Sequence, residues 1–228
     1  MKVLQINNVS KIYNENDVQV NAVNGVTLDF QEAEFAAVVG PSGSGKTTLL
    51  NLIGGLDNPT SGEILIDGTN LSKLKSSELI DFRMRNIGFV FQAYNLIPVL
   101  TAKENVEFIM NLQKWSKKDR DERTFELLKA VGLFDRANSR PTKMSGGQQQ
   151  RIAVARALAS RPKFVLADEP TANLDSKSAS TLLEIMEKLN HEEKITFIFS
   201  THDARVVKMA HRVITLEDGK VISDDLRE

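Results

Sequence analysis

Apolar residues in this 228-residue chain fall into short runs whose spacing is strand-like in some places and helix-like in others. Residues 3–13 and 20–30 have strand-like composition, and the polar stretch 14–17 between them predicts a β-hairpin. Residues 35–39 are wholly apolar. Such a short continuous run is typical of a central strand that is buried on both faces.

Strand and helix signals alternate along the rest of the chain. The expected strands are residues 64–66, 87–91, 164–167 and 195–200, and the expected helices between them include residues 48–56 and 178–189. Because strands that alternate with helices pair side by side, this order predicts a parallel sheet. Residues 213–222, with Asp218-Gly219 at their centre, predict a closing hairpin.

A helical segment interrupts this alternation between residues 101 and 160. Its helical patterns fall at residues 104–115, 120–131 and 147–159. We therefore predict one domain of the α/β class, with residues 1–92 and 161–228 forming the core and its β subdomain, and residues 93–160 forming an inserted helical subdomain.

Composition narrows the classes of function. Lys and Arg number 29 against 30 Asp and Glu, which disfavours a generic nucleic-acid-binding protein. The chain has no cysteine, which excludes disulfides and thiolate metal sites and fits a reducing compartment, so the cytosol is our default. No apolar stretch approaches the roughly 18 residues of a spanning helix. Any membrane role is therefore expected to come through a partner.

One glycine-rich loop between an expected strand and an expected helix matches G-x-x-x-x-G-K-[ST]. Its residues are Gly40, Pro41, Ser42, Gly43, Ser44, Gly45, Lys46 and Thr47. In this context the pattern predicts a phosphate-binding P-loop, because backbone N–H groups and the helix N-terminus converge on phosphate oxygens. We expect Lys46 to reach the β- and γ-phosphates of ATP, Thr47 to bind Mg²⁺, and Thr48 to contact the nucleotide. The fold class follows as a P-loop NTPase with a RecA-like core.

Two carboxylates follow the apolar run that starts at residue 164. In P-loop proteins an acid placed like Asp168 holds Mg²⁺. Glu169, one residue on, is suited to orient or deprotonate an attacking water. An Asp-Glu pair after a strand is by itself more often a solvated turn, and only its pairing with the P-loop favours the catalytic interpretation.

A second glycine motif precedes the helical pattern at 147–159. Ser145, Gly146, Gly147 and Gln148 lie at a helix N-terminus, which again suits an anion. One chain rarely needs two phosphate sites for one nucleotide. The motif resembles the L-S-G-G-Q signature of ABC-type ATPases, with Met144 in place of leucine, a change that conserves volume and apolarity.

The resemblance covers nearly the whole chain in the family's order, and it implies further site residues. Tyr13 resembles the aromatic residue that stacks on adenine, and Gln92 resembles the Q-loop glutamine, a further Mg²⁺ ligand. Residues 172–175, ending at Asp175, resemble the D-loop, and His202 resembles the switch histidine. Taken alone, Tyr13 is equally well an ordinary strand residue, Gln92 a strand cap and His202 a surface histidine. His191 and His211 lie on polar helical stretches without a motif, and we interpret both as solvated.

The resemblance also implies partners. ABC-type ATPases form a head-to-tail dimer, so the Lys46 loop of one copy and the Ser145 signature of another would enclose each ATP. Binding would close the dimer and hydrolysis would open it. The integral-membrane permease subunit is expected to contact residues Tyr94–Leu100 from the cytoplasmic face, although packing inside the helical subdomain explains this apolar stretch equally well.

Sequence stretches at 54–62, 87–92 and 145–151 most resemble the lipoprotein-release and macrolide-export class of ABC ATPases. The transported cargo is not encoded here. Two alternatives stay open: a cell-division-type regulator that gates a periplasmic partner without transport, and a soluble ATPase acting on DNA or ribosomes. The features usual in the last group, such as zinc cysteines or a basic surface, are not present.

Overall fold

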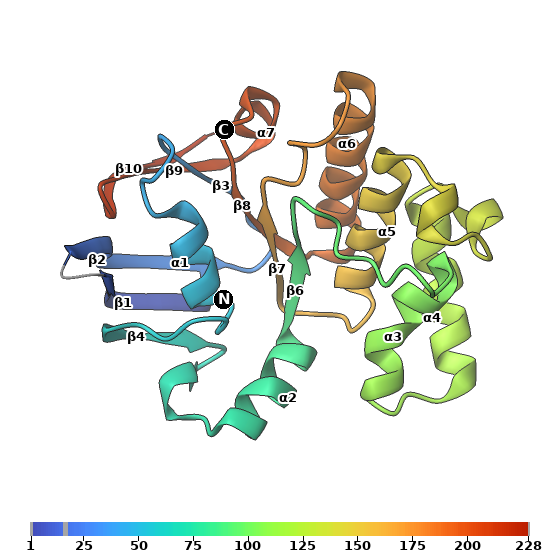
Figure 1. Ribbon diagram of the computed structural model, residues 1–228, viewed down its shortest axis with the longest axis horizontal. Coiled ribbons are helices and arrows are strands. Elements are labelled where there is room, and N and C mark those ends of the chain that lie inside the picture. The colour runs from blue at the N-terminus through green and yellow to red at the C-terminus, as the bar shows by residue number, and fades with distance from the viewer. Residues whose placement is uncertain (1, 16–17, 228) are drawn as a thin grey trace.

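The strands form two sheets, and Figure 1 shows the four-stranded one to the left of β6 and β7 of the six-stranded one. The computed structural model describes residues 2–15 and 18–227, so the tip of the predicted N-terminal hairpin at residues 16–17 lies outside the described residues. One sheet contains, in spatial order, β2 (Val18–Gln31), β1 (Lys2–Glu15), β4 (Ser61–Ile66) and β5 (Thr69–Asn70). The other contains β10 (Lys220–Leu226), β9 (Arg212–Glu217), β3 (Phe35–Val39), β8 (Thr196–Ser200), β7 (Phe164–Asp168) and β6 (Ile87–Val90).

Helices cover the larger sheet and form most of the segment after β6. They are α1 (Lys46–Ile53), α2 (Ser76–Asn86), α3 (Ala102–Leu112), α4 (Lys117–Ala130), α5 (Gly146–Leu158), α6 (Ser176–Glu193) and α7 (Ala204–Met209). Short 3₁₀ helices occur at Leu71–Lys73, Phe134–Arg136 and Pro141–Lys143. Within the described residues, no helix is both long enough and apolar enough to cross a lipid bilayer.

The larger sheet is parallel except for its last strand, as the alternating pattern predicted. Strands β9, β3, β8, β7 and β6 run parallel, and β10 pairs antiparallel with β9. Side chains of β3 alternate between two cores: Phe35 and Ala37 pack on one face, and Ala36 and Val38 on the other. Burial on both faces explains why this strand contains no polar residue.

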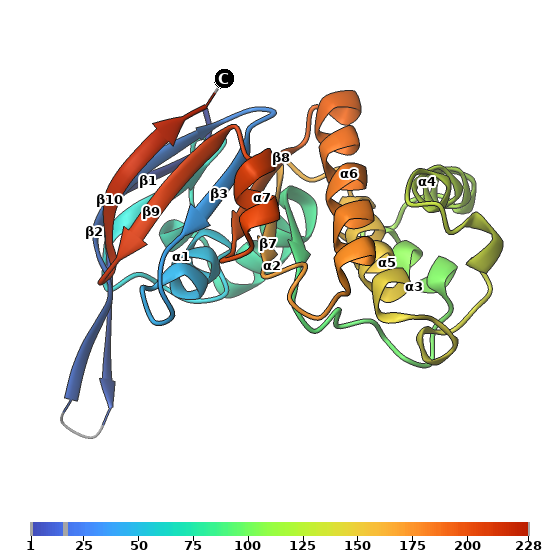
Figure 2. The ribbon, with the colours of Figure 1, turned by 90° about the horizontal axis from the view of Figure 1, so that it is seen from above.

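Each face of the larger sheet is covered by a different layer. Helix α1 and the four-stranded sheet share one core with one face, whereas α3, α5, α6 and α7 share the other core with the opposite face. Figure 2 shows α6 and α5 beside the sheet, with α3 and α4 farther from it. The carboxyl ends of β3, β7 and β8 therefore lie at one edge, between the two layers, where ligands bind in open α/β sheets.

Several elements differ from the sequence-based expectation. Helix α1 begins at Lys46 and ends at Ile53, rather than spanning residues 48–56, because the left-handed Gly45 caps it directly. Helices α2 and α7 were not predicted. Helix α2 buries none of its residues and α7 is a single six-residue segment, so neither produces a strong apolar period. His211, which we expected on a helical stretch, lies between α7 and β9 instead.

Candidate functional site

The glycine-rich loop connects β3 to α1 and wraps tightly around the start of the helix. Gly45, the N-cap of α1, has φ 99°, and a Cβ there would lie 2.1 Å from the carbonyl oxygen of Ala22. A Cβ on Gly40 would lie 2.0 Å from the carbonyl oxygen of Leu216. Because neighbouring strands approach so closely, only glycine fits at these two positions. These close approaches fix the path of the loop between β3 and the first turn of α1.

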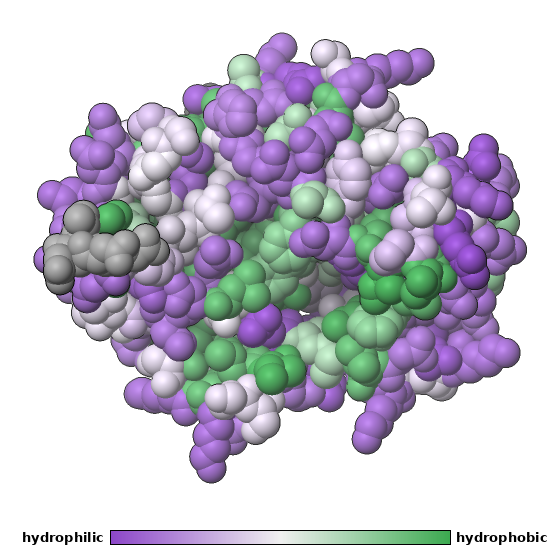
Figure 3. Space-filling model, in the orientation of Figure 1, coloured by the Kyte–Doolittle hydropathy of each residue, from purple (hydrophilic) through white to green (hydrophobic). Residues whose placement is uncertain are grey.

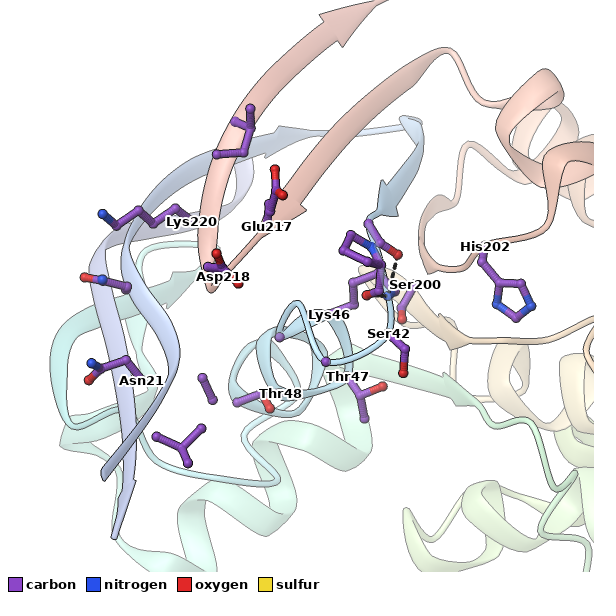
Figure 4. A pocket seen from close by; sticks show the side chains of 18 of the residues that line it. Asn21, Ser42, Lys46, Thr47, Thr48, Ser200, His202, Glu217, Asp218 and Lys220 are labelled. Atoms are coloured by element: carbon purple, nitrogen blue, oxygen red, sulfur yellow. Dashed lines mark hydrogen bonds between the residues drawn. The ribbon is translucent and has the colours of Figure 1, made fainter. Parts of the chain in front are cut away.

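An open cleft of about 1180 Å³ lies over this loop (Figure 4). Its lining includes all of the predicted loop residues except Ser44, and it also includes Thr48, Gln92, Glu169 and His202. Ser44 is buried and its carbonyl accepts a hydrogen bond from the Gly219 N–H at 3.1 Å. Lys46 Nζ donates to the carbonyl oxygens of Gly40 and Pro41, both at 2.9 Å, which holds the ammonium over the loop. The cleft is thus positively charged at its floor.

One wall of the cleft comes from residues that the sequence did not indicate. Asn21 of β2 and the turn that joins β9 to β10, with Glu217, Asp218 and Lys220, line it (Figure 4). The Gly219 N–H bond to the P-loop brings this turn to the site. The turn itself was recognisable from Asp218-Gly219, but its position depends on the pairing of β9 with β3, which no local signal reveals.

A hydroxyl and a carboxylate converge at the start of α1. Thr47 Oγ1 lies 3.2 Å from both carboxylate oxygens of Asp168, which ends β7. Mg²⁺ prefers oxygen ligands in octahedral geometry and commonly combines one or two protein ligands with phosphate oxygens. Thr47 and Asp168 therefore fit a Mg²⁺ ion bound beside the P-loop. Thr47 and Gln92 line the cleft, whereas Asp168 is not among its lining residues.

Glu169 and His202 form a direct pair at the adjoining strand ends. Glu169 Oε1 lies 2.7 Å from His202 Nδ1, and the Thr201 hydroxyl donates to Glu169 Oε2 at 3.2 Å. Glu169 has φ 45°, a left-handed conformation that is uncommon for a non-glycine residue and recurs at functional sites. The Glu169 N–H donates to the carbonyl of Ser200, so the β7 and β8 ends are fastened together. This geometry can orient a water against a terminal phosphate.

The segment after Glu169 is fixed by a residue that sequence reasoning missed. Gln150 of α5 is fully buried, and its Nε2 donates to the carbonyl oxygens of Pro170 at 2.8 Å and Phe91 at 3.2 Å. Asn173 Nδ2 donates to the carbonyl of Gln92 at 3.0 Å. The Gln92 loop and the residues that follow Glu169 are therefore held as one unit.

Asp203, next to His202, also contacts the segment that follows Glu169. Its carboxylate pairs with Arg205 at 2.7 Å and accepts a hydrogen bond from the Thr171 hydroxyl at 2.6 Å. The hydrogen bonds from Arg205, with that from Thr171, lower the pKa of Asp203 from 3.8 to about 2. The ionised carboxylate thus stabilises the contact between the β7 and β8 loops.

We expect Asp203→Asn to lower the free energy of unfolding by about 1–2 kcal/mol at neutral pH. Because the folded-state pKa is depressed, the stabilisation is fully present above pH 3.8 and is lost as the pH falls towards 2. Urea unfolding at several pH values measures the difference between the two chains. Asp135→Asn, which removes the same charge at an exposed site, is the control. A pH-independent difference would contradict this role.

The second glycine motif is not part of the cleft. Ser145 caps α5 with a reciprocal pair of bonds: its backbone N–H donates to Gln148 Oε1 at 2.9 Å, and its Oγ accepts from the Gln148 N–H at 3.3 Å. A Cβ on Gly146 would lie 2.6 Å from the Tyr94 hydroxyl, and one on Gly147 would lie 2.8 Å from Ser178. None of these motif residues lines the cleft, and neither does Asp175, which caps α6.

Tyr13 also lies outside the cleft lining. Its hydroxyl donates to Asp57 Oδ2 at 2.7 Å, and burial together with this carboxylate raises its pKa. Tyr13 pairs across the hairpin with Val20, which does line the cleft. Adenine stacking on Tyr13 stays a prediction.

Comparison with known proteins decides the family. The family model described as "ABC transporter" matches residues 23–172. The chain belongs to the ABC transporter family. An uncharacterized ABC transporter ATP-binding protein of Thermotoga maritima is 47% identical over 96% of this chain and 94% of its own. The YvrO protein of Bacillus subtilis, with the same description, is 46% identical over 98% and 97%.

Solved structures agree with this assignment to the ABC family. The cassette MJ0796 of Methanocaldococcus jannaschii, described as a dimer in a post-hydrolysis state bound to ADP and Pi, has a TM-score of 0.90 and 43% identity over 99% of each chain. CbiO1 of Clostridium perfringens, described as part of the transporter complex cbiONQ, has a TM-score of 0.88 and 28% identity over 99% of this chain and 88% of its own. The present chain is an ABC-type ATPase, and the prediction of a P-loop NTPase fold is confirmed.

Proposed function

We propose that this ABC ATPase powers a membrane complex by closing around ATP as a head-to-tail dimer of two copies. The main support is that the chain has two anion-binding elements, the P-loop and the Ser145 motif, and that they lie apart. The P-loop lines the cleft, whereas the Ser145 motif caps α5 outside it. A second copy that presents Ser145, Gly146, Gly147 and Gln148 to the first copy's cleft would complete each site. The cassette MJ0796, at 43% identity, is described as dimeric, which supports pairing of two copies.

Roles within the composite site follow from the contacts. Lys46 and the loop N–H groups bind the phosphates, and Thr47 and Asp168 would hold Mg²⁺, which would supply charge neutralisation of the phosphates. Glu169 accepts a proton from the attacking water, and His202 at 2.7 Å keeps its carboxylate in place. Asp175 bonds to Ser178, which lies beside Gly147 of the same chain, so Asp175 would face the partner's cleft together with the Ser145 motif.

An apolar surface beside the Gln92 loop is suited to a membrane partner. Figure 3 shows apolar residues around a hollow between α1 and α2 on one side and α3 and α5 on the other. Three large apolar side chains are exposed in this part of the sequence: Val99 in the loop before α3, and Phe108 and Leu112 on α3. Asn105, fully buried, bonds to Ile97 in both directions, so the 94–100 loop has a fixed shape.

The 94–100 segment was expected either to contact a membrane subunit or to pack inside the helical subdomain, and different residues of it fit each interpretation. Leu96 packs against the core of the helical segment, whereas Val99 is 70% exposed. A buried floor with an exposed apolar rim fits a groove that receives a short helix of an integral-membrane subunit from the cytoplasmic side. A contact of this kind beside Gln92 would reach the ATP cleft through the Asn173 and Gln150 bonds.

Val99→Asp is expected to abolish co-purification of the chain with its integral-membrane partner from native membranes, while basal ATP hydrolysis stays unchanged. The reason is that a carboxylate would be buried without a counter-charge in an apolar contact. Leu226→Asp makes the same change at an 81% exposed site on β10 and serves as the control. Recovery of the partner with the Val99→Asp chain would remove the 94–100 surface from the proposal.

Within the ABC ATPases, we propose that this chain belongs to the lipoprotein-release and macrolide-export class. The support is the resemblance of sequence stretches at 54–62, 87–92 and 145–151. Mass spectrometry of the membrane subunit that co-purifies with the native chain tests this assignment. A subunit with four spanning helices and a large periplasmic domain is the expected result. Association with a cell-division complex, or fractionation with nucleic acid, would instead support one of the two alternatives.

A further inference from the structure

Two histidines and a glutamate that are distant from the ATP cleft lie together on the surface. Glu187 and His191 are one helical turn apart on α6, and His211 lies between α7 and β9. One ligand atom from each residue lies within 4.8 Å of the other two. The imidazole rings of His191 and His211 have centroids 6.1 Å apart at 59°. The two histidines are exposed, as predicted, but they are not unrelated surface residues.

The backbone holds both sides of this cluster firmly. The His211 N–H donates to the Phe35 carbonyl at 2.9 Å, and the His211 carbonyl accepts from the Arg227 N–H at 2.7 Å. His211 is therefore pinned between β3 and the C-terminal strand. Glu187 and His191 project from an 18-residue helix whose opposite side is buried in the core. Rigid positions of this kind reduce the ordering cost of binding a ligand.

The cluster's polar atoms are free to bind a cation. Among residues 2–15 and 18–227, no hydrogen bond or ion pair engages the Glu187 carboxylate or the His191 and His211 imidazoles. Arg205 and Arg227, which line the adjoining cavity of about 530 Å³, are engaged elsewhere. Arg205 pairs with Asp203, and Arg227 Nη1 donates to the Val207 carbonyl at 2.8 Å. Within the described residues, neither arginine forms an ion pair with Glu187, and Lys208, which lines the same cavity, forms none with it either.

We propose that Glu187, His191 and His211 form a binding site for a divalent transition-metal ion of the zinc class. Two imidazoles and one carboxylate are a common three-ligand set for Zn²⁺, with water in the fourth position. Imidazole ligands favour Zn²⁺, Ni²⁺ or Cu²⁺ over Mg²⁺, which takes oxygen ligands. The site is thus chemically distinct from the Thr47 and Asp168 pair beside the P-loop.

A bound ion would connect two segments that lead away from the ATP site. Helix α6 begins directly after Asp175, and the α7 segment begins directly after Asp203 and His202. A metal link between the far ends of these segments resists their separation. The ion therefore stabilises the folded chain in proportion to its affinity.

Isothermal titration of the untagged, full-length chain with Zn²⁺ tests the site. We expect one Zn²⁺ per chain at this site and at least a tenfold loss of affinity for His191→Ala, His211→Ala and Glu187→Gln. Glu184→Gln, on the same helix and lining the same cavity, is the control and should bind like the unaltered chain. Zn²⁺ should also raise the thermal unfolding midpoint of the unaltered chain but not that of the His191→Ala/His211→Ala double variant.

Two results would overturn the proposal. One is the absence of saturable Zn²⁺ binding to the unaltered chain. The other is equal Zn²⁺ affinity of the unaltered chain and the double variant, which would place the ion elsewhere, for example at the Glu169 and His202 pair. The visible spectrum of bound Co²⁺ distinguishes the sites further, because only the proposed site should lose its tetrahedral bands in the double variant.

Discussion

A chain carrying Glu169→Gln is expected to bind ATP as the unaltered chain does but to hydrolyse it about 10²–10⁴-fold more slowly. Glu169 is the carboxylate at the carboxyl end of β7, held by His202 at 2.7 Å and by Thr201 at 3.2 Å. Glutamine keeps the shape and the Thr201 hydrogen bond, but its amide cannot accept a proton from water. Phosphate release at saturating ATP measures the loss, and filter binding of labelled ATP measures retention.

Glu192→Gln provides the control for this variant, because it makes the same change at an exposed position on α6. Turnover by Glu192→Gln should match that of the unaltered chain. If Glu169→Gln retains turnover within a factor of about three, another group accepts the proton and the role assigned to Glu169 is wrong.

Gly45→Ala is expected to destabilise the chain more than substitution of Gly43, a P-loop glycine with open space around it. The added Cβ would lie 2.1 Å from the Ala22 carbonyl oxygen, so β2 or the P-loop must move. Movement of a packed backbone costs about 1–3 kcal/mol in addition to the cost of placing alanine at φ 99°. We expect a loss of unfolding free energy of about 3 kcal/mol or more, and at least a 100-fold loss of ATP affinity.

Gly43→Ala is the matched comparison for stability. Gly43 also has positive φ, 81°, but a Cβ there would meet nothing within 4 Å. Its substitution should therefore cost only the conformational penalty, about 1–2 kcal/mol. Urea unfolding of both variants separates the two contributions. Equal losses would show that the close approach between Gly45 and Ala22 does not constrain the loop.

The parts of the fold that were predictable have strong local signals. Residues 35–39 are apolar throughout because the strand is buried on both faces, and the P-loop is marked by its glycines. Helix α2 escaped prediction because it buries none of its residues and so carries no apolar period. The apolar period along the sequence arises from burial of one face of an element, so an element that buries no residue has no clear period.

The site residues that could be predicted from the sequence are those at or just after the ends of strands. Thr47, Asp168, Glu169 and His202 converge because parallel strands end at one edge. The wall formed by the turn after β9 could not be predicted, since it depends on which strand lies beside β3. The same holds for Gln150, whose two acceptors lie 59 and 20 residues away. His191 and His211 meet for a similar reason, through packing of α6 against the corner before β9.

Two copies of the chain are proposed to complete each ATP site, and the molar mass of the Glu169→Gln chain in solution measures this pairing. Light scattering during size exclusion, with saturating ATP and Mg²⁺, should give twice the mass of one chain, and the mass of one chain without nucleotide. Adding Ser145→Arg to the same chain should prevent the doubling, because the arginine would remove the signature contact to the partner's ATP. A Glu169→Gln chain that stays monomeric with saturating ATP, or one that doubles equally well with Ser145→Arg, would contradict an ATP site shared between two copies.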